Sequence, residues 1–156
     1  MTGSSKKTYR PSEFFRDLFG VVKGLPSLAG AVTHRRVGGA LREKVMLAVT
    51  GVNECRYCAA IHSSLARKLN VSEEDIGRIM ESGTGADPDN DDQPAIHFAA
   101  HYAQTNQHPD PDMVSMIRET YGPERAAELL HYMRMIYFAN LTGNTFDALL
   151  GRLKAH

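Results

Sequence analysis

The chain has 156 residues, of which 42% are hydrophobic and 23% are charged, and its formal net charge is zero. This length fits one domain with a real buried core, and the composition is that of an ordinary globular protein. A neutral chain lacks the basic surface of proteins that bind nucleic acid or the membrane surface. It also has no apolar run near the roughly 20 residues that a membrane span needs. We therefore expect neither nucleic acid nor membrane among its partners.

Residues 1–10 are polar and basic and contain no apolar segment of the kind found in a signal peptide. They predict a flexible N-terminal tail, followed by a single domain over residues 11–156. Without a targeting segment, the default expectation is a cytoplasmic location.

The first predicted helix begins at Pro11, because proline is favoured in the first turn of a helix and apolar residues follow at helical spacing. Gly24-Leu25-Pro26 predicts a break. A second, short helix is expected over residues 27–36, ended by Gly38-Gly39.

Residues 41–52 allow two interpretations. The apolar run at positions 45–49 could be a buried strand that leads into a Cys-x-x-Cys motif, as in thioredoxin. A parallel sheet needs several strands, however, and flanking strands are hard to find. The run is also about twelve residues long, which favours a buried helix. We therefore predict a helix here.

The rest of the chain also has the pattern of helices, so the predicted fold is all-α. Residues 133–139 are apolar on nearly every side, which predicts a helix buried in the core or at a subunit contact. Residues 142–144 are expected to kink or break that helix. The acidic segment 83–93 is interpreted as a solvated loop, with a calcium site as the less favoured alternative because the spacing of an EF-hand is missing. The further helices are expected over residues 55–69, 72–80, 94–104, 112–121, 122–141 and 146–153.

The only two cysteines, Cys55 and Cys58, lie three residues apart, and His62 follows four residues later. On a helix these three side chains share one face, since residues three and four apart are neighbours. A helix N-terminus favours a thiolate, the species that attacks peroxides and disulfides. A histidine can accept the thiol proton, and a carboxylate can orient that histidine. Glu43 could supply this carboxylate if its helix packs antiparallel to the next.

The spacing Glu43, Cys55, Cys58, His62 resembles the signature of the AhpD-like proteins, within the carboxymuconolactone decarboxylase family. The close resemblance covers roughly residues 41–80. It implies an all-helical fold that assembles into trimers or hexamers through apolar helices. It also implies a thiol-dependent hydroperoxide reductase or disulfide oxidoreductase that needs no cofactor. Its partners would be a hydroperoxide substrate and a thiol reductant or a lipoyl-type or thioredoxin-like electron donor.

By this resemblance Cys58 would be oxidised first to a sulfenic acid, Cys55 would resolve it as a disulfide, and His62 with Glu43 would relay protons. Nearness to the helix end alone would instead favour Cys55 as the more acidic thiol. Proximity to His62 supports Cys58, and we follow that assignment.

Other interpretations compete with this one. A decarboxylase or lactone-acting enzyme of the same superfamily would generally lack the cysteine pair. A redox-responsive binding or scaffold protein would use the disulfide to change its assembly. A zinc site could combine Cys55, Cys58 and His62 with Glu43 or with the pair His97 and His101, although structural zinc usually involves a second paired motif. We predict no metal.

Overall fold

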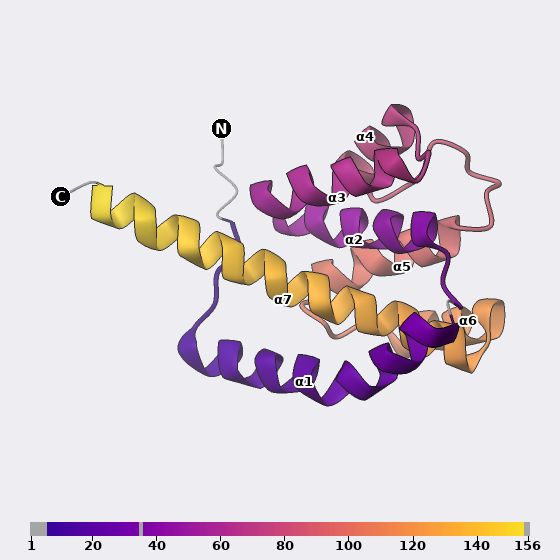
Figure 1. The fold of residues 1–156 in the computed structure, drawn as a ribbon, viewed down its shortest axis with the longest axis horizontal. Helices are drawn as coiled ribbons and strands as arrows, with labels where there is room; N and C mark the ends of the chain where they lie inside the picture. Colours follow the sequence, from indigo (N-terminus) through magenta and orange to yellow (C-terminus); the bar gives the residue numbers. More distant parts are fainter. Residues whose placement is uncertain (1–5, 35, 155–156) are drawn as a thin grey trace.

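The computed structural model describes residues 6–34 and 36–154. These residues form seven α-helices and no strand, so the all-α prediction is confirmed and the thioredoxin alternative is excluded (Figure 1). The helices are α1 (Pro11–His34), α2 (Gly39–Asn53), α3 (Arg56–Lys68), α4 (Glu73–Ser82), α5 (Gln93–Gln104), α6 (Pro111–Tyr121) and α7 (Pro123–Lys154).

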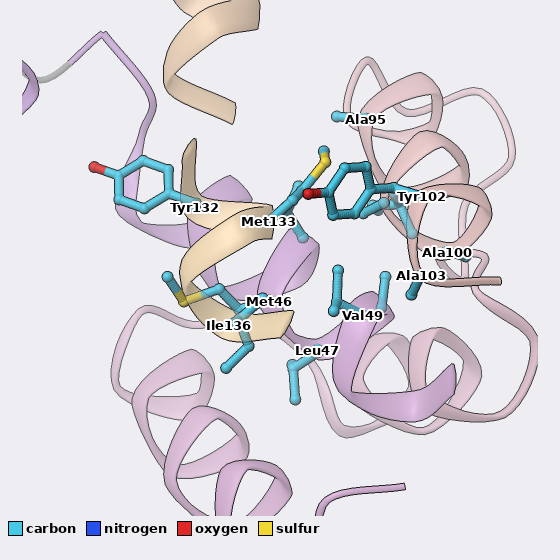
Figure 2. Close-up of a cluster of buried hydrophobic side chains, with 14 of the residues drawn as sticks. Met46, Leu47, Val49, Ala95, Ala100, Tyr102, Ala103, Tyr132, Met133 and Ile136 are labelled. Carbon is cyan, nitrogen blue, oxygen red and sulfur yellow. The ribbon is translucent and has the colours of Figure 1, made fainter. Parts of the chain in front are cut away.

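Helix α2 is the centre of the fold. It packs against α3, α4, α5 and α7, and the side chains of Val45, Leu47 and Val49 are completely buried. Figure 2 shows this core, in which α2 side chains meet Tyr102 of α5 and Met133 of α7. A helix that is apolar on every side must be covered on every side. The prediction of a buried helix over residues 41–52 is thus confirmed.

Helix α1 runs without interruption from Pro11 to His34, so the break expected at residues 24–26 and the separate helix over 27–36 were wrong. The ribbon bends along its length instead and lies beside α7 (Figure 1). Gly24 has a packing role. A Cβ at this position would collide with the imidazole ring of His131, which is buried on α7. The glycine therefore permits the close approach of two helices.

Helix α7 is also continuous, from Pro123 to Lys154, so the kink or break expected at residues 142–144 was wrong. Its C-terminal turns extend beyond the other helices (Figure 1). The glycine and asparagine at positions 143 and 144 do not interrupt the helix but serve packing. Gly143 lies against Cys55, and Asn144 binds the chain just before α3.

The acidic loop over residues 83–93 is attached to the body of the protein through Lys44, which is buried on α2. The Lys44 Nζ atom lies 3.1 Å from Asp92 Oδ2 and 3.8 Å from Asp75 Oδ2. The Asp75 Oδ1 atom in turn accepts a hydrogen bond of 2.6 Å from the N–H of Ala86. Part of the negative charge of this segment therefore compensates a buried lysine.

The predicted flexible tail is described only from residue 6 onward, and residues 1–5 lie outside the described part of the chain. Lys7 donates a hydrogen bond of 2.7 Å to the carbonyl of Ala103, and the Tyr9 N–H donates one of 2.8 Å to Thr145 Oγ1. Over residues 6–34 and 36–154, none of the helices combines the length and the apolar character required for a membrane crossing.

The close contact at Gly24 gives a first testable prediction. Gly24→Ala should destabilise the protein by about 1–3 kcal/mol, because the added methyl group overpacks the α1–α7 contact at His131. Gly20→Ala is the matched control on the same helix, where a Cβ meets nothing within 4 Å. That control should be neutral or stabilising by up to about 1 kcal/mol. Urea unfolding measures both, and equal stability of the two variants would contradict the packing argument.

Candidate active site

Both cysteines lie at the N-terminal end of α3, where the chain turns sharply after α2. Helix α2 ends at Asn53, and Glu54 adopts a left-handed conformation with φ of 55°. Cys55 is then the N-cap residue of α3, and Cys58 is the third residue of the helix. Both thiols therefore lie in the region where the unpaired N–H groups of a helix favour negative charge.

The two thiols are in direct contact. Both cysteines are free, and the Cys55 Sγ donates a hydrogen bond to the Cys58 Sγ over 3.0 Å. A disulfide has an S–S length of about 2.05 Å, so the pair is a reduced dithiol whose sulfurs are already neighbours. Cys55 is 1% exposed and Cys58 is 8% exposed. Of the two, Cys58 is thus the more accessible.

Glu43 and His62 form the second half of the site. Glu43 projects from α2 and is 1% exposed. Its Oε2 atom lies 2.7 Å from the Nδ1 of His62 on α3. Its Oε1 atom accepts a hydrogen bond of 2.9 Å from the Nε of Arg42. The structure therefore brings Glu43 to the helix of the thiols, as the spacing predicted.

Two opposing effects determine the charge of Glu43. Burial raises the pKa of the carboxyl group, but hydrogen bonds from His62 and Arg42 and their positive charges outweigh it and lower the pKa below its ordinary value of 4.5. Glu43 is therefore a carboxylate at neutral pH. It orients the His62 ring through Nδ1, which leaves Nε2 to face another group.

The pKa of the Cys58 thiol is raised, in contrast to that of Glu43. Burial raises it first, and the adjacent Cys55 raises it further through its hydrogen bond and its charge. The Cys58 thiol is thus protonated at neutral pH in the resting protein. His62 lies one turn after Cys58 on α3, and no hydrogen bond joins it to either thiol in the described part of the chain. Any reaction through a Cys58 thiolate therefore requires a base at the moment of reaction.

Helix α7 closes the site, and this contribution was missed by the sequence analysis. A Cβ at Gly143 would lie 3.0 Å from the Cys55 Sγ, so α7 approaches the buried thiol as closely as a glycine allows. Asp147, one turn later, accepts hydrogen bonds from Tyr57 Oη at 2.6 Å and from an Arg56 Nη at 2.7 Å. The pattern at residues 142–144 was visible in the sequence, but it was interpreted as a helix break.

His97 and His101, considered as a second ligand pair for zinc, lie on a different helix from the cysteines and His62. His101 lies on α5, where its Nε2 accepts a hydrogen bond of 3.2 Å from the N–H of Asp110. Over residues 6–34 and 36–154, no group of three or more histidine, cysteine or acidic side chains is arranged to hold a metal ion.

The model of the Carboxymuconolactone decarboxylase family matches residues 21–87 of the chain. This match confirms the family resemblance predicted from the sequence, and it is consistent with an AhpD-like protein. All four candidate site residues lie inside the matched segment, whereas α7 lies outside it. Neither the curated proteins nor the solved structures gave a match.

The lowered pKa of Glu43 gives a prediction on stability. A carboxyl group whose pKa is lowered by folding stabilises the protein fully above its unfolded value, here 4.5, and this contribution is lost as the pH falls through the lower folded value. Glu43→Gln should therefore cost about 1–3 kcal/mol at pH 7. The difference from wild type should shrink below pH 4.5.

Urea unfolding between pH 7 and pH 3 measures this difference. Glu119→Gln, an exposed position on α6, is the matched control and should follow wild type throughout. A Glu43→Gln deficit that stays constant down to pH 3 would contradict the assignment of Glu43 as a buried carboxylate.

Proposed function

We propose that the protein is a thiol-dependent hydroperoxide reductase that cycles Cys55 and Cys58 between dithiol and disulfide. One observation carries the proposal. Two free thiols lie in contact at the N-terminus of α3, and the buried Glu43 of α2 contacts the partly buried His62 of α3. Nucleophile, base and orienting carboxylate are the three parts of an activated nucleophile.

The first step oxidises Cys58. His62 takes the thiol proton, and the thiolate attacks one oxygen of the hydroperoxide ROOH. The O–O bond breaks, an S–O bond forms, and the leaving alkoxide takes a proton to become ROH. Cys58 is then a sulfenic acid, and the peroxide has received two electrons. Glu43 stabilises the His62 imidazolium through the 2.7 Å contact at Nδ1.

The second step forms the disulfide. Cys55 loses its proton and attacks the Cys58 sulfur, so an S–S bond forms, the S–O bond breaks and the oxygen leaves as water. Contact between the sulfurs at 3.0 Å favours this step. An external dithiol, of lipoyl or thioredoxin-like type, then returns two electrons and two protons. These steps need no organic or metal cofactor, and a dithiol resting state fits the reducing cytoplasm.

Accessibility supports Cys58 as the first thiol to react. Its side chain is the less buried of the two, and it lies one helical turn from His62. Nearness to the helix N-terminus does not favour one cysteine over the other as the more acidic thiol, because both lie in the first turn of α3. Gly143 covers Cys55, which suits a resolving cysteine that attacks the Cys58 sulfenic acid from the protein interior.

The two roles predict different defects for the two serine variants. Cys58→Ser should reduce peroxide turnover to the background rate. Cys55→Ser should still react once, and it should then accumulate a sulfenic acid on Cys58, because no second thiol is present in the chain. Peroxide-consumption kinetics with a dithiol reductant, combined with mass spectrometry of trapped sulfenic acid, test both. Ser64→Ala on the exposed part of α3 is the control.

Full turnover by folded Cys58→Ser would refute the assignment of roles. Loss of turnover in neither variant would refute the thiol mechanism altogether, and would return the decarboxylase and scaffold alternatives to consideration.

The protein also has exposed apolar faces, which support assembly with further copies of itself. On α3 and its C-cap residue, the side chains of Tyr57, Ile61, Leu65 and Leu69 recur every four residues and are all 37% or more exposed. Such a stripe forms one continuous helix face. Two further stripes lie on α1 (Phe15, Phe19, Val22) and on the C-terminal end of α7 (Phe146, Leu149, Leu153). We propose that these faces bury one another in a trimer or hexamer.

Replacement of the α3 stripe should dissociate this assembly. The double variant Ile61→Gln, Leu65→Gln should shift the measured mass toward that of the monomer, because it removes apolar area that drives association. Light scattering coupled to size exclusion gives the mass. Ser115→Gln, at an exposed site on α6, is the control and should keep the assembly of wild type. Wild type that is monomeric at all concentrations would contradict the proposal.

A further inference from the structure

Next to the cysteine pair lies a buried cluster of polar side chains, which we name the asparagine cluster. It consists of Thr50 and Asn53 of α2 and Asn140 and Asn144 of α7, each 2% exposed or less. Thr50 Oγ1 donates a hydrogen bond of 3.2 Å to Asn140 Oδ1. Polar groups in a core cost free energy unless they are bonded, so such a cluster requires a reason.

Asn144 connects three separate parts of the chain. Its Nδ2 atom donates one hydrogen bond of 2.7 Å to the carbonyl of Asn53 and another of 3.1 Å to the carbonyl of Lys7. The Asn53 carbonyl is the last of α2 and lies two residues before Cys55. Asn144 therefore holds the N-terminal segment and the turn between α2 and α3 against α7.

The residue before Asn144 acts on the thiol itself. Gly143 leaves space for the Cys55 Sγ, since a Cβ there would lie only 3.0 Å from this sulfur. Neighbouring residues of one helix thus fix the backbone before Cys55 and limit the positions of its side chain. Cys55 must reach the Cys58 sulfur for a disulfide to form, and small displacements strongly affect reactions between positioned groups.

We propose that Gly143 and Asn144 of α7 are positioning residues for Cys55, and that they determine how readily the Cys55–Cys58 disulfide forms. The inference rests on the dithiol–disulfide cycle proposed above and extends it to a helix outside the matched family segment. Neither residue touches the peroxide. They act through the turn and the thiol that they hold.

The test is the thiol–disulfide equilibrium of the pair against a dithiothreitol redox buffer, which needs no peroxide. Asn144→Ala releases the turn before Cys55 and lowers the effective concentration of one thiol at the other. The equilibrium constant should move toward the dithiol by about tenfold, equal to about 30 mV for a two-electron couple. Asn140→Ala is the matched control, because it disrupts the same cluster but has no bond to the turn. It should lower the stability and leave the equilibrium constant unchanged.

Gly143→Ala is the second variant, and it keeps the test decisive if Asn144→Ala does not fold. The methyl group displaces the Cys55 Sγ or α7, so the equilibrium constant should change by at least about threefold. Gly151→Ala on the same helix, where a Cβ meets nothing within 4 Å, should behave like wild type.

Equilibrium constants of Asn144→Ala and Gly143→Ala equal to that of wild type would overturn this inference and leave the peroxidase proposal intact. Conversely, shifted constants in a protein that does not consume peroxide would support the positioning role and refute the peroxidase. Absence of any Cys55–Cys58 disulfide in wild type would refute both.

Discussion

The contact between the buried Glu43 and His62 is the constraint on which the rest of the site depends. A carboxylate that is 1% exposed is stable only if its charge is compensated, and here the 2.7 Å contact to His62 and the bonds from Arg42 compensate it. This pairing requires α3 to pack across α2 at the level of Glu43. The same packing places Cys58, one turn before His62, beside the core. Structure and proposed chemistry thus share one interaction.

Helix α7 holds in place the turn between α2 and α3 that carries the cysteines. The two thiols lie at a turn, where a short chain with a left-handed residue would otherwise have considerable freedom. Gly143 and Asn144 hold this turn against a helix of 32 residues, whose other contacts reach α1, α5 and α6. The cysteine pair is therefore held against a long helix, and we propose that this positioning, as well as the pKa of the Cys58 thiol, governs its reactivity.

The sequence predicted the helical fold, and it also predicted that Glu43 would lie near the helix of the cysteines and His62, because both predictions follow largely from local rules. The length of the apolar run at residues 41–52 distinguished a helix from a strand, and the spacing of the cysteines and His62 placed them on one face. The breaks at Gly24 and Gly143 were predicted wrongly because glycine has two different structural roles in helices. Glycine can end a helix, or its missing side chain can allow another residue to pack closely against the helix, as His131 does at Gly24 and Cys55 at Gly143. Only the tertiary partner distinguishes the two, and the sequence alone does not identify it.

The central claim is that Glu43 and His62 act as one unit on Cys58. A double-mutant cycle tests it, with the rate of Cys58 oxidation by peroxide measured for Glu43→Gln, His62→Gln and the double variant, all in the Cys55→Ser background. Residues that act as a unit are strongly non-additive, so each single variant should lose roughly 10²-fold or more in rate and the double variant little further. Rate losses that multiply in the double variant would show independent action and contradict the account.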